Sequence, residues 1–302
     1  MLEGLKLIKK EIDFPEFRFI YWADIMYEKP LNENITDRED PLFLDEPYTP
    51  APENFIPKLN SVRQKVLDFI DEQLDRIFLN DDLTVNFSAI TDKIIHNYFR
   101  ELEIYYSEEC LDVNDTSCKA KETIRKRVAD VIRSHKDDKI MLIGHSMGSI
   151  IAYDVLTYVV PDVEIDTFIT IGSPLGMPVI VGKIASTSNN KYTGEYKLRT
   201  PPGVKWRWFN FSDLEDKVAL IYNLSKKFNR NSHGVRPENY VVYNNYIMDG
   251  EKNHHKSFGY LRTPEFSRVL YRFARREKIH TYDRILLHIK SFFRKMRFWI
   301  RY

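Results

Sequence analysis

Ser146 lies at the centre of Gly144-His145-Ser146-Met147-Gly148, which matches the pattern G-x-S-x-G. An apolar run at 139–143 comes directly before it, and an apolar helical stretch at 148–158 comes directly after it. A strand that turns sharply into a helix forces strained dihedral angles on the central residue and leaves no room for a Cβ at either flanking position. The serine hydroxyl would then be exposed at the positive end of a helix. This context favours a nucleophile over an ordinary glycine-rich turn.

Two aspartates and two histidines downstream could complete the machinery that a nucleophilic serine needs. The hydroxyl requires a base to take its proton and an acidic residue to orient that base. With such an elbow, these partners follow in the order Ser, then Asp or Glu, then His. Asp213 and Asp216 come just after an apolar strand expected at 204–211, and His254 and His255 lie on a late loop. Either aspartate could instead cap a helix, so the residues alone leave two candidates for each role.

Neither metal nor disulfide chemistry is indicated. Adjacent histidines can bind a metal, but no third ligand accompanies His254 and His255 at a suitable spacing. The two cysteines, Cys110 and Cys118, form no C-x-x-C pattern and are expected to be free thiols in a reducing compartment. We therefore expect no metal, no organic cofactor and no nucleic-acid partner.

The order of the expected elements indicates an α/β fold. Short apolar strands at 139–143, 165–171, 204–211 and 240–243 alternate with helical stretches, and a helix is also expected within 214–226. Strands separated by helices imply a mostly parallel sheet with helices on both faces. Aromatic and β-branched residues at 17–22 predict a further buried strand.

Composition divides the chain into three parts. We expect a catalytic core made of 1–29 and 118–276. An acidic helical insertion at 30–117 interrupts it, and helices within that insertion could form a cap over an apolar acyl site. A basic amphipathic helix at 277–302 follows the core.

The tail carries the one membrane-related feature of the sequence. No window holds the roughly 18 apolar residues of a membrane span and no signal segment opens the chain, so we expect a cytoplasmic protein. If the tail is helical, its apolar and aromatic residues form a stripe on one face, and most of its cationic residues lie elsewhere. The stripe consists of Ile285, Ile289, Phe292, Met296 and Trp299. Such a helix could lie on an anionic surface at the inner membrane face, or pack on the protein itself.

These motifs resemble those of the α/β-hydrolase serine esterases and lipases, particularly a poorly characterised bacterial set. The likeness rests on the elbow, on Ile171-Gly172-Ser173-Pro174, on the turn around Asp216-Lys217-Val218 and on the loop His-Lys-Ser-x-Gly-Tyr-Leu. It covers about 119–276, with a weaker match at 17–26. It implies an α/β-hydrolase fold with an inserted helical cap, with Asp216 as the acid and His255 as the base.

The sequence departs from this group in one respect. Members usually open with an apolar strand that ends in His-Gly, and the loop after it supplies one of two backbone N–H donors to the oxyanion. No such segment precedes Leu2. The other donor would be the N–H of Met147, so either the chain is truncated relative to these proteins or another loop supplies the second donor.

The expected activity is hydrolysis of a carboxylic ester, either a small molecule or a lipid, through an acyl-enzyme on Ser146. A thioesterase or acyltransferase would use the same triad, and a catalytically weak hydrolase fold could act as a membrane or protein adaptor. The sequence does not indicate the acyl chain, the leaving group or the oligomeric state.

Overall fold

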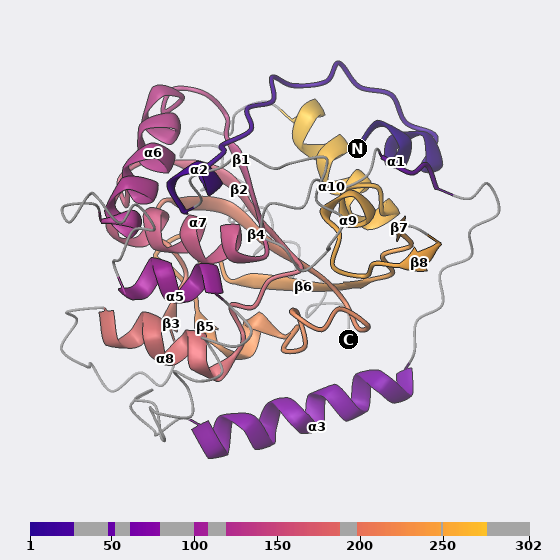
Figure 1. Cartoon of the computed structure of the whole chain (residues 1–302). Helices are drawn as coiled ribbons and strands as arrows, with labels where there is room; N and C mark the ends of the chain where they lie inside the picture. The colour runs from indigo at the N-terminus through magenta and orange to yellow at the C-terminus, as the bar shows by residue number, and fades with distance from the viewer. Residues whose placement is uncertain are drawn as a thin grey trace, which may run out of the picture.

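The computed structural model describes residues 1–26, 48–51, 61–78, 100–107, 119–187, 198–248 and 250–276. At its centre, four parallel strands pair in the order β1-β2-β4-β6 (Figure 1). They are β1 (Met141–His145), β2 (Ile165–Ile171), β4 (Val204–Asp213) and β6 (Pro237–Val242). The parallel sheet expected from the sequence is confirmed.

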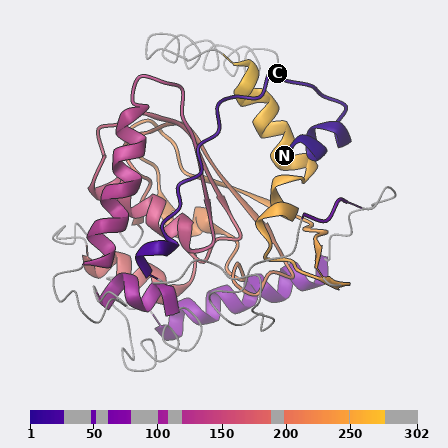
Figure 2. The same ribbon diagram turned by 45° about the horizontal axis from the view of Figure 1, so that its top comes forward.

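Side chains of the strands alternate between two hydrophobic cores, one on each face of the sheet. Phe168 and Trp208 belong to one core, and their neighbours Ile169 and Phe209 belong to the other. Helices from different parts of the chain cover the two faces (Figures 1 and 2). The first core includes α6 (Ala120–Ser134), α7 (Met147–Tyr158) and α8 (Pro178–Thr187), and the second includes α1 (Leu2–Leu7) and α10 (Pro264–Arg275). Burial on both faces explains why these strands are almost continuously apolar.

Two described helices, α3 (Ser61–Phe78) and α5 (Arg100–Ser107), come from the predicted insertion. In α5, the Tyr105 hydroxyl donates to Asp154 of α7, and the same carboxylate accepts from Arg125 at 2.6 Å. The helix α3 packs through the buried Leu67, which lies in a hydrophobic cluster with Leu214 and Tyr222. Polar contacts also hold it: Arg63 Nε to Leu214 O at 2.5 Å, Gln64 Nε2 to the Tyr222 hydroxyl at 3.1 Å, and the buried pair of Lys227 and Asp71 at 2.6 Å. The bounds of the insertion remain a prediction.

The remaining described elements are short. They are α2 (Ala23–Met26), β3 (Leu198–Arg199), η1 (Leu224–Lys226), β5 (Phe228–Asn229), β7 (Ile247–Met248), β8 (Glu251–Lys252) and α9 (Ser257–Leu261). Among the helices described, none has the length and apolar character that crossing a bilayer requires. The tail predicted to be helical, 277–302, lies outside the described residues.

The strand predicted at 17–22 is wrong. This segment is extended, but within the described ranges it pairs with no strand, and Phe17 and Phe19 are 56% and 77% exposed. Aromatic and β-branched residues favour a strand where a neighbouring strand packs beside them. In this segment only Ile20 and Trp22 pack on the hydrophobic core.

The helix predicted within 214–226 is also wrong, because only the short η1 is helical there. The Asp216 carboxylate accepts the backbone N–H of Val218 at 2.9 Å and of Ala219 at 3.4 Å, which competes with helical hydrogen bonding.

Candidate active site

Ser146 occupies the sharp turn between β1 and α7. Its dihedral angles are φ 50° and ψ −127°, a strained combination for a residue with a side chain. A Cβ at Gly144 would lie 2.7 Å from the Cα of Ser149, so this glycine is required sterically. A Cβ at Gly148 would meet nothing within 4 Å, and the expectation that both flanking glycines are needed for space is therefore wrong for Gly148.

His255 lies between Ser146 and Asp216. Its Nε2 is 3.0 Å from the Ser146 Oγ, and its Nδ1 is 2.9 Å and 3.0 Å from the two carboxylate oxygens of Asp216. An ionised carboxylate only accepts hydrogen bonds, so Nδ1 must carry the N–H that faces Asp216. In the neutral imidazole Nε2 is then the acceptor that faces the serine hydroxyl. The three residues come from the elbow, the loop after β4 and the loop before α9, which are far apart in the sequence.

Asp216 is fully buried but well supplied with donors. The Tyr260 hydroxyl donates to its Oδ2 at 2.7 Å, and the backbone N–H of Val218 donates to its Oδ1 at 2.9 Å. Burial alone would raise the pKa of Asp216, but the hydrogen bonds from His255, Tyr260 and Val218 outweigh it and lower the pKa below the usual value. The carboxylate is therefore ionised at neutral pH.

The two alternative residues form a separate pair. His254 Nδ1 is 3.1 Å from Oδ2 of Asp213, and the same oxygen accepts the backbone N–H of Asn244 at 2.6 Å. The structure thus brings Asp216 and His255 to Ser146 and joins Asp213 to His254.

Tyr260 is a site residue that the sequence reasoning did not single out. Besides donating to Asp216, its hydroxyl accepts the backbone N–H of Asp213 at 2.9 Å, so it connects the two aspartates. Burial and the neighbouring Asp216 carboxylate raise the pKa of Tyr260 well above its usual value, so the hydroxyl remains a donor. Tyr260 lies in the loop motif that ends in Gly-Tyr-Leu, and its place in that motif was the only signal in the sequence that pointed to it.

A comparison with protein families matches residues 97–205 to the PGAP1-like alpha/beta domain. No curated protein and no solved structure gives a match. The chain has an α/β-hydrolase-type fold. The matched residues include β1, the elbow, α7 and β2, whereas Asp216 and His255 lie beyond them, so the case for these two rests on the geometry.

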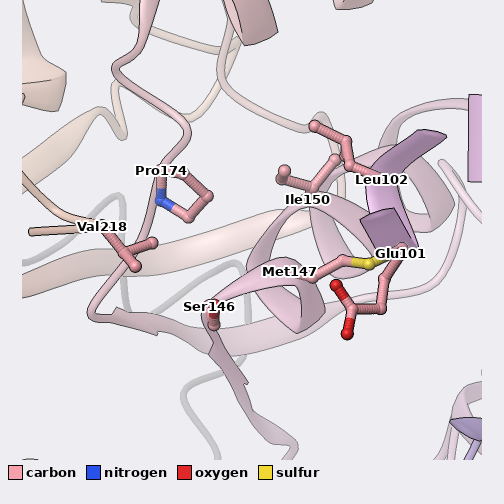
Figure 3. A pocket seen from close by; sticks show the side chains of 7 residues that line it. All are labelled: Glu101, Leu102, Ser146, Met147, Ile150, Pro174 and Val218. Carbon is pink, nitrogen blue, oxygen red and sulfur yellow. The ribbon is translucent and has the colours of Figure 1, made fainter. Parts of the chain in front are cut away.

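A small pocket opens over the elbow of this hydrolase fold. It has a volume of about 120 Å³ and is lined by Glu101, Leu102, Ser146, Met147, Ile150, Pro174 and Val218. Figure 3 shows Ser146 between Pro174 and Val218 on one side and Met147 and Glu101 on the other. Met147 is the first residue of α7, and the first N–H groups of a helix have no partner within it. In the described part of the chain, no three His, Cys, Asp or Glu side chains gather as metal ligands.

His145 provides a prediction about stability. Burial, followed by repulsion from His255, lowers the pKa of His145 from 6.5 to about 4. The unfolded chain therefore takes up a proton between pH 6.5 and 4 that the folded chain does not, and the free energy of unfolding should fall by about 3 kcal/mol as pH decreases through this window.

Urea unfolding at several pH values between 7 and 4 measures this loss. The variant His145→Gln has no titrating group at this position, so its stability should decrease less over the same window. Equal pH dependence in the two proteins would contradict the prediction.

Proposed function

We propose that the protein is a serine hydrolase that cleaves carboxylic esters through an acyl-enzyme on Ser146. The observation that carries this proposal is the continuous contact from the Ser146 Oγ through His255 to the buried Asp216 carboxylate. A serine is a weak nucleophile without such a base, and an imidazole needs an acidic partner to hold the correct tautomer.

The proposed reaction has two steps. His255 takes the Ser146 proton on Nε2 while Oγ attacks the carbonyl carbon; the oxyanion then collapses, the C–O bond of the ester breaks, and the alcohol leaves with the proton from His255. In the second step a water gives its proton to His255 and attacks the acyl-serine, which releases the acid and returns the proton to Oγ. The Asp216 carboxylate stabilises the imidazolium in both steps, and the N–H of Met147 is the proposed oxyanion donor.

The pocket supports an ester with an apolar group next to the scissile bond. Five of its seven lining side chains are apolar, and the Glu101 carboxylate at its edge disfavours an anionic group there. Such a pocket suits a short acyl group or the first part of a lipid chain.

Labelling with a fluorophosphonate probe tests the proposal, because the probe reacts only with an activated serine. We expect labelling of the wild-type protein at the peptide that contains Ser146, and loss of both labelling and ester turnover in Ser146→Ala. A folded wild-type protein that the probe does not label would instead favour the adaptor function. If esters are turned over, product analysis with an alcohol or a thioester present separates hydrolase from acyltransferase or thioesterase.

A further inference from the structure

The loop that carries His255 is held by side chains at three consecutive carbonyl groups. The carbonyls of His254 and Lys256 both accept from the side-chain amide of Asn244, at 2.9 Å and 2.8 Å. The carbonyl of His255, between them, lies 2.7 Å from Nε2 of His145. Two side chains from other parts of the chain thus fix the loop on both sides of the imidazole.

Asn244 is itself firmly placed. It is completely buried, its backbone N–H donates to Asp213 at 2.6 Å, and its Oδ1 accepts the backbone N–H of Tyr246 at 3.0 Å. A Cβ at Gly259, in the middle of α9, would lie 1.6 Å from this Oδ1, so only a glycine allows the helix to approach Asn244 this closely. Both N–H groups of the Asn244 side-chain amide are therefore used to hold the loop, while its oxygen accepts from Tyr246.

His145 connects the same loop to the nucleophile. It immediately precedes Ser146, and its ring centroid is 4.7 Å from that of His255. Because its pKa is lowered to about 4, the ring is neutral at working pH and carries a single N–H. With that proton on Nε2, the ring donates to the His255 carbonyl.

We propose that Asn244 and His145 are positioning residues for His255, which hold the imidazole at the distance from which it takes the Ser146 proton. This inference rests on the proposed function. Asn244 acts through the backbone of the loop, whereas His145 acts through the His255 carbonyl and through its ring, which lies beside the imidazole. Displacing a catalytic group by about 1 Å can cost on the order of 10²-fold in rate, so the anchoring of this loop has a direct kinetic consequence.

A matched pair of variants at His145 tests the proposal. His145→Gln keeps an N–H donor at a similar reach, whereas His145→Met has a similar volume and no donor. With p-nitrophenyl butyrate as substrate, and with enzyme concentration set by active-site titration with the fluorophosphonate probe, we expect His145→Met to lower kcat by roughly 10- to 100-fold with little change in KM. His145→Gln should recover most of this loss.

Asn244→Asp provides an independent second variant. It keeps the shape of the side chain, but a carboxylate oxygen replaces the N–H donor that faces the carbonyls of His254 and Lys256. We therefore expect kcat and the rate of labelling to fall, with KM little changed. Thermal unfolding of each variant separates this effect from a loss of folded protein. Equal kcat per titrated site in His145→Met, His145→Gln and the wild type would overturn the positioning role while Ser146 is still labelled. Absence of labelling in the wild type would instead refute the proposed function.

Discussion

Replacing His255 by alanine is expected to lower ester turnover by roughly 10⁴- to 10⁶-fold, the range for loss of the base in a serine hydrolase. The reason is its position: Nε2 is 3.0 Å from the Ser146 Oγ, and without this acceptor the hydroxyl has no group to take its proton. Measurement of kcat/KM with p-nitrophenyl butyrate at pH 8 checks the result.

The adjacent histidine supplies the control. His254→Ala changes the same residue type one position earlier and removes a contact with Asp213, but it leaves in place the backbone carbonyl that accepts from Asn244. We expect it to retain activity within about tenfold of the wild type. If His254→Ala abolished turnover and His255→Ala did not, the role of base would pass to His254.

The elbow and the sheet could be predicted from the sequence because their signals are local. The apolar run of β1, the G-x-S-x-G pattern and the apolar start of α7 are contiguous, and backbone sterics connect them. The parallel sheet follows from the alternation of apolar strands with helices.

The segment 17–22 shows where local signals are insufficient. Its composition favours a strand, but a strand also needs a neighbour with which to pair, and the described chain provides none there. The helix predicted after Asp216 does not form, because the Asp216 carboxylate accepts the backbone N–H groups of Val218 and Ala219, which a helix would use for its own hydrogen bonds.

The choice between neighbouring candidates depends on three-dimensional structure. His254 and His255 are adjacent in the chain, yet one lies against Asp213 and the other against Asp216 and Ser146. The contacts made by Asn244 have no local signal in the sequence, because they depend on which backbone carbonyls converge near the end of β6. The catalytic roles themselves remain predictions that the variants test.

The pair of aspartates gives the second large expected effect. Asp216→Asn should lower kcat by about 10⁴-fold with a small change in KM, because the Asn amide can donate to Nδ1 of His255 and so hold the wrong tautomer. The buried, ionised Asp216 carboxylate would lose its charge but keep its shape, so the fold should persist.

Asp213→Asn is the matched control, since the same change is made three residues earlier. Its side-chain oxygen can still accept the N–H of Asn244 and lie against the ring of His254, while the contact of the other carboxylate oxygen with the Glu215 N–H is lost. None of these contacts reaches Ser146 or His255, so we expect activity within about tenfold of the wild type. Kinetics of both variants between pH 6 and 9, with folding checked by circular dichroism, decide between the two residues. A greater loss in Asp213→Asn than in Asp216→Asn would assign the acid to Asp213, and the short contacts between His255 and Asp216 would then have to be structural rather than catalytic.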